Sequence, residues 1–175
     1  MRIRRARVSE VMAIHSIVAA YAAQGILLSR TKDHIQKGIG DYLVALDGGR
    51  VIGCVALETY GGAAFAEIRS LAVAPDARGA GTGAKLLNAA LSQARRRKIG
   101  RLLAVTSSTA FFERHGFHRV RGGMPAEKVT RDCAQCSKAA ACRLEALAVD
   151  LAPAPAILPV LQRSRFPRTA QPVLA

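Results

Sequence analysis

The stretch RSLAVAPDARGAGTG, residues 69–83, constrains the fold more than any other part of the sequence. Its apolar run ends at Pro75 and predicts a strand, while the segment after Gly83 predicts a helix with a single apolar face, formed by Leu86, Leu87, Ala90, Leu91 and Ala94. Glycines between the two allow backbone N–H groups to converge on an anion at the positive end of the helix. A strand–loop–helix unit suited to a phosphate-bearing ligand is therefore expected here.

Two common phosphate-binding loops are excluded by residue positions. A P-loop needs a lysine directly after its second glycine, followed by Ser or Thr, whereas Lys85 is separated from Gly83 by one residue and precedes a leucine. A dinucleotide fingerprint needs Gly-x-Gly-x-x-Gly, whereas these glycines are spaced by two. What remains is Arg78-x-x-Gly81-x-Gly83, for which a pyrophosphate site and an ordinary glycine-rich connection are both open.

Alternating strand and helix patterns indicate one α/β domain with a mixed sheet. Strands are predicted at 2–8, 42–58 (with a DGG turn at 47–49), 64–73, 101–106, 117–122 and 144–151, and helices at 9–23, 32–39, 83–98 and 108–116. The domain is expected to span residues 1–151. Five of the seven prolines fall in residues 152–175, which predicts a disordered, Pro/Ala-rich basic tail outside the fold.

Charge and apolar patterning limit the partners. Lys and Arg number 26 against 12 Asp and Glu, so anionic ligands should be attracted. Nucleic acid is disfavoured because the chain has no tryptophan and few aromatic side chains for stacking. No apolar run approaches the ~20 residues that cross a bilayer. The basic start resembles a secretory signal, but Glu10, His15 and Ser16 interrupt its apolar stretch, so an amphipathic helix and a cytoplasmic location are predicted.

The strand IRSLAVAP, the loop DARGAGTG, the helix after it and the later AFFERHGF together resemble the GNAT superfamily of acyl-CoA N-acyltransferases. The resemblance implies the GNAT fold, a central mixed, twisted sheet flanked by helices in a single domain, with acetyl-CoA as co-substrate and a homodimer as one possible assembly. By motif position, Leu71, Ala72 and Val73 would contact the pantetheine arm. The pyrophosphate would be bound by Arg78, Gly79, Ala80, Gly81, Thr82, Gly83 and Ala84.

A tyrosine that many GNAT members use as a general acid is missing. The matching stretch reads Phe111-Phe112-Glu113. This departure argues against members that depend on the tyrosine, including typical protein N-terminal acetyltransferases.

A narrower resemblance covers nearly all of residues 2–150. The stretch GILLSRTKDHIQKGIGDYLVALDGGRVIGCVALETY, followed by AEIRSLAV, is similar to the acetyltransferase domain of bacterial N-acetylglutamate synthase. It implies acetyl transfer to the α-amino group of L-glutamate, the entry step of arginine biosynthesis. Glu67 would be the general base, acting through a water, and Thr106 would stand where members place a hydroxyl acid. The glutamate would be bound by Leu28, Arg30, Ser70 and Arg143.

These assignments agree with elementary chemistry. An amino acid's ammonium group must lose a proton before it attacks a thioester, and a positioned carboxylate accelerates such a step. A backbone N–H near Leu71 is suited to the developing oxyanion, and the arginine fork matches a carboxylate. Purely structural roles for these residues also stay open. Glu67 could be a surface carboxylate paired with Arg69, Arg30 a solvated loop residue, and Thr106 a group that completes a strand end.

Two other functions remain open for this sequence. One rival is a GNAT enzyme that acts on glutamine, another amino acid or a protein N-terminus, and a second is a catalytically silent acetyl-CoA-binding regulatory module. No metal is expected in the site. Metal binding, reduced thiols and a disulfide are all compatible with Cys133-x-x-Cys136 and Cys142, although a structural zinc normally needs a fourth ligand.

Overall fold

The computed structural model describes residues 1–60, 65–121, 124–134, 136 and 142–151. Their strands form one sheet in the order β1-β2-β3-β4-β5-β7-β6, in which only β4 and β5 pair in parallel. The strands are β1 (Arg2–Arg5), β2 (Tyr42–Asp47), β3 (Arg50–Tyr60), β4 (Phe65–Val73), β5 (Arg101–Thr106), β6 (His118–Arg119) and β7 (Glu145–Asp150). The helices are α1 (Val11–Ala23), α2 (Lys32–Lys37), α3 (Thr82–Arg96), α4 (Thr109–Glu113) and α5 (Ala126–Lys128).

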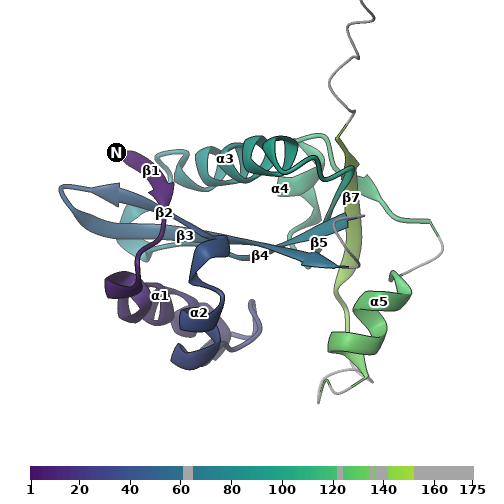
Figure 1. Cartoon of the computed structure of the whole chain (residues 1–175), viewed down its shortest axis with the longest axis horizontal. Helices are drawn as coiled ribbons and strands as arrows, with labels where there is room; N and C mark the ends of the chain where they lie inside the picture. Colours follow the sequence, from purple (N-terminus) through teal and green to yellow (C-terminus); the bar gives the residue numbers. More distant parts are fainter. Residues whose placement is uncertain (61–64, 122–123, 135, 137–141, 152–175) are drawn as a thin grey trace, which may run out of the picture.

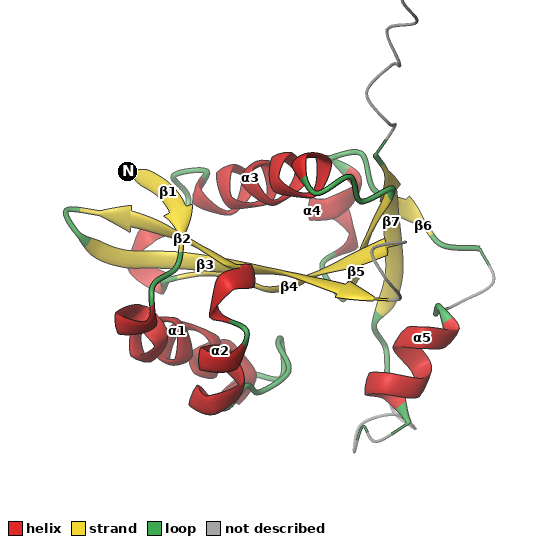
Figure 2. Cartoon of the chain, in the orientation of Figure 1, coloured by secondary structure: helices red, strands yellow, loops and turns green. Residues whose placement is uncertain are grey.

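Helices cover both faces of the sheet. Figures 1 and 2 show α3 and α4 on one face and α1 and α2 on the other, so the sheet separates two apolar cores. Alternation along β4 assigns side chains to these faces: Ala66 and Ile68 belong to the core under α3, so Glu67 and Arg69 lie on the opposite face. The apolar face expected on α3 is confirmed, because Leu86, Leu87, Ala90, Leu91 and Ala94 are all buried.

Shorter helical turns connect these elements. They are the 3-10 turns η1 (Val8–Glu10), η2 (Ile39–Asp41) and η4 (Pro75–Ala77), and the π-type turn η5 (Val129–Cys133). The single mixed α/β sheet is as predicted, but two details differ. The strand expected at 117–122 is reduced to His118–Arg119, and the helical segment at 126–133 was not predicted. That segment is short and largely polar, so it has no apolar periodicity to detect.

The tail predicted at 152–175 lies outside the described residues. Among the helices that the structure does describe, none is long and apolar enough to cross a membrane.

Gly53 of β3 lies close to both β4 and α3. A Cβ at this position would lie 2.9 Å from the Ala72 carbonyl oxygen and 3.0 Å from Leu86 Cδ1. Gly53→Ala should therefore lower the free energy of unfolding by about 1–3 kcal/mol, because backbone or core must shift. Urea unfolding measures the change. Gly40→Ala is the matched control, since its Cβ would meet nothing within 4 Å. Equal stability of the two variants would contradict the prediction.

Candidate active site

A bulge in β4 opens the sheet. Cys54 pairs with Ala72 and Ala56 with Arg69, so two residues of β4, Ser70 and Leu71, stand opposite Val55 alone. Ser70 has a φ of 50°, in the left-handed region that non-glycine residues rarely adopt. Such an extra residue bends the strand that carries it and disrupts its pairing. The bulge therefore changes the direction of the second half of β4.

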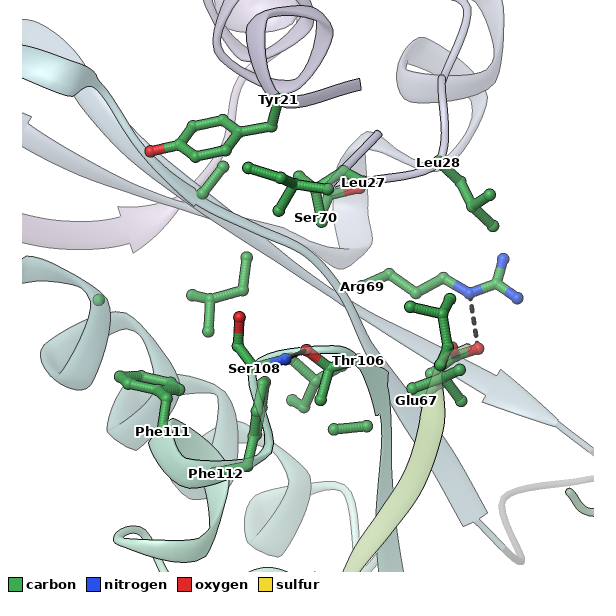
Figure 3. Close-up of a pocket in the computed structure, with 18 of the residues that line it drawn as sticks. Tyr21, Leu27, Leu28, Glu67, Arg69, Ser70, Thr106, Ser108, Phe111 and Phe112 are labelled. Carbon is green, nitrogen blue, oxygen red and sulfur yellow. Dashed lines mark hydrogen bonds and ion pairs between the residues drawn. The ribbon is translucent and has the colours of Figure 1, made fainter. Parts of the chain in front are cut away.

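Beyond the bulge, β4 and β5 no longer pair. Their parallel register ends at Ile68 and Ala104, although β4 continues to Val73 and β5 to Thr106. A cavity of about 520 Å³ lies in this region and is lined by both strands. Figure 3 shows its labelled walls, with Tyr21, Leu27 and Leu28 on one side and residues 106–112 on the other. An extended ligand placed here can use strand backbone groups that β5 leaves unpaired.

The glycine-rich loop leads from β4 into α3 as expected. Gly79 and Gly81 have φ values of 81° and 73°, and Gly81 is the N-cap of α3. The first N–H groups of a helix lack intrahelical acceptors, so this end of α3 offers donors to an anion. Of the predicted CoA-binding residues, the ones that line the cavity are Leu71, Ala72, Val73, Arg78 and Gly83. The turn and the first turn of α3 contain the rest, Gly79, Ala80, Gly81, Thr82 and Ala84.

Tyr21 of α1 contacts both the end of β4 and the loop that follows it. Its hydroxyl donates to the Val73 carbonyl and accepts from Arg78 Nε at 2.9 Å. The Arg78 guanidinium also lies over the Tyr21 ring, 4.9 Å from its centroid. Sequence reasoning missed this residue, because nothing local links α1 to a loop more than fifty positions later. Tyr21 thus orients the one arginine of the loop.

Tyr21→Phe should raise the KM for acetyl-CoA about 3- to 10-fold and leave kcat nearly unchanged. The change removes the hydrogen bonds to Val73 and Arg78, each worth roughly 0.5–1.5 kcal/mol. Steady-state kinetics with varied acetyl-CoA measures it. Ser16→Ala is the control on the same helix, because its hydroxyl bonds only to the Met12 carbonyl. An unchanged KM would show that Tyr21 does not support the loop.

Glu67 lies at the end of the cavity and is 3% exposed. Three groups donate to a single oxygen, Oε2: Tyr60 Oη at 2.7 Å, Arg69 Nε at 2.8 Å and Lys128 Nζ at 2.8 Å. The Arg69 bond is the dashed line in Figure 3. Within the described residues, Oε1 accepts no hydrogen bond. Glu67 is paired with Arg69, as its purely structural role would require, but Glu67 is buried and not on the surface.

Asp132 of η5 joins the same cluster. Its Oδ2 accepts from Lys128 and Arg69, and it also lies within hydrogen-bond distance of the Tyr60 hydroxyl, whose single hydrogen is shared between Asp132 and Glu67. Burial opposes its ionisation, but the hydrogen bonds from Tyr60 and Lys128 and the Arg69 charge lower the pKa of Asp132 to about 2. Burial, followed by hydrogen bonds to Asp132 and Glu67, raises the pKa of Tyr60. The cluster therefore keeps an ionised aspartate and a protonated tyrosine at neutral pH.

Arg30 borders two cavities. It lines the main cavity and a second one of about 150 Å³ between α2 and β3, and Arg69 also lines both. In the described part of the chain Arg30 forms no ion pair. Leu28 and Ser70, the other expected substrate contacts, line the main cavity with it. Arg143 does not join them: it is exposed, and its neighbour Leu144 lines the cavity instead.

Thr106 lines the opposite wall. Its Oγ1 accepts a hydrogen bond from the Ser108 backbone N–H at 2.9 Å, so Thr106 completes the strand end, as its purely structural role would require. The Thr106 O–H is still available as a donor toward the cavity that Thr106 lines. Phe111 and Phe112 also line the cavity, at the positions where a tyrosine was sought. Of these two rings, Phe112 is the one buried in the core under α3. Among the described residues, the hydroxyl groups on this wall therefore come from β5 and the turn after it, at Thr106 and Ser108, and not from α4.

No cysteine of the described residues lines the main cavity. Cys133, Cys136 and Cys142 form no disulfide, and no group of three or more His, Cys, Asp and Glu among the described residues is arranged for a metal. Cys54 on β3 is fully buried, and burial raises the pKa of its thiol to about 12. Cys54 therefore stays protonated, and its thiol donates to the Ser70 carbonyl at 3.4 Å.

Besides Tyr21, sequence reasoning did not select four residues around Glu67: Arg69, Lys128, Tyr60 and Asp132. Arg69 carried a usable signal, because it is two residues from Glu67 and strand alternation puts both on one face. Tyr60 carried a weaker one, as it lies on the neighbouring strand across a hairpin. Lys128 and Asp132 had none, since they approach Glu67 from a segment whose position no local pattern reveals.

The strand β4 separates from its parallel neighbour next to a glycine-rich helix start, which suits an extended, pyrophosphate-bearing donor such as acetyl-CoA. The family described as Acetyltransferase (GNAT) domain matches residues 38–119. An N-acetyltransferase of Chlorobaculum tepidum is 36% identical over 80% of this chain and 90% of its own length. The chain therefore belongs to the GNAT acetyltransferases and is an acetyl-CoA-dependent N-acetyltransferase.

Two further relatives are more specific. An amino-acid acetyltransferase of Mycobacterium tuberculosis is 36% identical over 69% of this chain and 70% of its own. The structure of N-acetylglutamate synthase from Neisseria gonorrhoeae, complexed with coenzyme A and N-acetyl-glutamate, superimposes with a TM-score of 0.78 at 28% identity, over 86% of this chain. This chain spans 35% of the Neisseria protein.

Proposed function

We propose that this acetyltransferase transfers the acetyl group of acetyl-CoA to the α-amino group of L-glutamate, with Glu67 as general base. One observation carries the proposal: a buried carboxylate with one unoccupied oxygen lies at the end of the cavity that β4 and β5 open. That oxygen is where a proton from the acceptor amine, or from a water between them, would be received.

The donor would lie along the second half of β4. Its pantetheine amides match the backbone groups of Leu71, Ala72 and Val73, which line the cavity where β5 no longer pairs. Its pyrophosphate would lie against Arg78 and the start of α3, where glycine backbone and the helix dipole favour negative charge. This placement directs the thioester toward Glu67 and Thr106.

An acidic amino acid suits the other end of the cavity. Four cationic side chains line the cavity, Arg30, Arg69, Arg78 and Lys128, against the single carboxylate of Glu67. Arg69 and Lys128 are already bonded to that carboxylate, which leaves Arg30 for the acceptor's side-chain carboxylate. Main-chain groups of Leu28 and Ser70 would hold its α-amino-acid end. The named relatives, which include an amino-acid acetyltransferase and N-acetylglutamate synthase, support the same class of acceptor.

The reaction would then proceed by direct attack. Glu67 takes a proton from the ammonium, and the free amine adds to the thioester carbonyl. A backbone N–H near Leu71 donates to the oxyanion. Collapse of the tetrahedral intermediate breaks the C–S bond, and the thiolate takes a proton from the Thr106 hydroxyl or a nearby water. The second proton of the attacking nitrogen replaces it, so that the nitrogen becomes a neutral amide. The products are CoA and the N-acetylated amino acid.

Thiol release from acetyl-CoA across the twenty amino acids and a short peptide tests the proposal. L-glutamate should give the highest kcat/KM. Turnover with the peptide alone would contradict the acceptor class, and a clear preference for glutamine would contradict the role of Arg30. CoA binding without turnover for any amine would identify a regulatory module instead.

A further inference from the structure

Lys128 is a buried cation outside the strands that build the cavity. It is 3% exposed, and its Nζ donates to Glu67 Oε2 at 2.8 Å and to Asp132 Oδ2 at 2.9 Å. Removing an ammonium group from water is costly unless anions surround it. Lys128 has two such anions, and one of them is the proposed base.

The Lys128 segment, residues 126–133, is attached to the sheet by polar contacts. Arg131 pairs with Glu58 on β3 at 2.5 Å, and its guanidinium lies 3.8 Å from the centroid of the Tyr60 ring. Figure 2 shows α5 beside the end of the sheet, on the side of α1 and α2, to which the Glu67 side chain also projects. The segment thus brings Lys128 to the buried Glu67 carboxylate, near the end of the sheet.

The charged and titratable groups around Glu67 come from four elements. Tyr60 lies on β3, Arg69 on β4, Lys128 on α5 and Asp132 on η5. Tyr60, Arg69 and Lys128 all donate to Oε2, which fixes the rotation of the carboxylate. In the part of the chain that the structure describes, Oε1 accepts no hydrogen bond.

We propose that Lys128 is a positioning residue for Glu67: it holds Oε2 in place so that Oε1 receives the proton. The inference rests on the proposed role of Glu67 as base. Arg69 also donates to Oε2 through its Nε, and its other two nitrogens pair with Glu58 and Asp132, so Lys128 is the donor that reaches Oε2 from outside the sheet. The rate of the reaction would then depend on residues 126–133, although the residues proposed to bind acetyl-CoA lie on other elements.

The test compares Lys128→Met with the parent enzyme on its best acceptor. We expect kcat to fall about tenfold with the KM for acetyl-CoA unchanged. Lys128→Arg should restore most of the rate. Glu127→Gln, an exposed neighbour on the same helix, is the matched control and should change neither quantity.

A double-mutant cycle separates positioning from general stability. In a Glu67→Gln background, Lys128→Met should cause no further loss of turnover. Additive losses would overturn the inference. Lys128→Gln is the second variant in case the methionine protein does not fold, since its amide still donates but carries no charge. It should show a smaller loss of kcat than Lys128→Met, and CoA binding reports its folded fraction.

The two proposals fail differently. Full activity of Glu67→Gln would remove the base and, with it, the role of Lys128. An inactive Glu67→Gln protein beside an unaffected Lys128→Met protein would remove the role of Lys128 alone.

Discussion

Replacing Glu67 with glutamine should lower kcat about 10²- to 10⁴-fold at neutral pH, the usual contribution of a positioned general base. The amide has nearly the shape of the carboxylate and keeps an oxygen for Tyr60, Arg69 or Lys128. It cannot take up a proton, however, so the acceptor must lose its own to solvent. Thiol release with saturating glutamate and acetyl-CoA measures the effect.

Two accompanying results separate a lost base from a lost fold. CoA binding by calorimetry should be unchanged, because the donor region from Leu71 to Gly83 does not include Glu67. The deficit should also shrink as pH rises, since a growing fraction of the amine is already deprotonated. Glu67→Asp, which keeps a carboxylate one methylene shorter, should have intermediate activity. Full turnover of the glutamine variant at neutral pH would remove the assignment.

Replacing Arg30 with methionine should raise the KM for glutamate about 10- to 100-fold and change kcat much less. A charge-assisted hydrogen bond to a carboxylate contributes roughly 1.5–3 kcal/mol, which corresponds to that range. The loss should be specific to the acidic side chain. Weak turnover of neutral amino acids should therefore stay the same or improve relative to glutamate, as competition assays can show.

Lys32→Met is the matched control for this prediction. It removes the same charge two residues away, from an exposed position that borders neither cavity. If both variants weaken glutamate binding equally, the effect comes from net charge, which attracts anions over long range. If neither does, Arg30 does not contact the acceptor, and its position between the two cavities serves the structure alone.

Local patterns predicted much of the fold because they reflect local causes. The apolar face of α3 is visible at helical spacing, and Leu86, Leu87 and Ala90 are indeed buried. The strands at 64–73 and 101–106 were visible as apolar runs bounded by turns, and the structure has them at Phe65–Val73 and Arg101–Thr106. The glycine cluster predicted a loop that opens a helix, and the structure has Gly81 as the N-cap of α3.

The bulge at Ser70 was not predictable in this way. No glycine marks it, and its left-handed φ arises only because Cys54 and Ala56 pair with residues on either side of it. Register between strands depends on the partner strand, so one strand's sequence does not specify it. The opening between β4 and β5, and hence the cavity, follows from that register.

The sequence by itself determined the family, the acetyl-CoA donor and the candidate base, because each depends on a contiguous motif whose backbone conformation is set locally. Tertiary structure alone decided that Glu67 is buried, which of its oxygens is occupied, and that Lys128 and Asp132 reach it from residues 126–133. It also decided that Arg30 lines the cavity while Arg143 does not. The reason is physical: ion pairs across sixty residues are selected by distance and burial in the folded chain, and neither quantity exists until the sheet has formed.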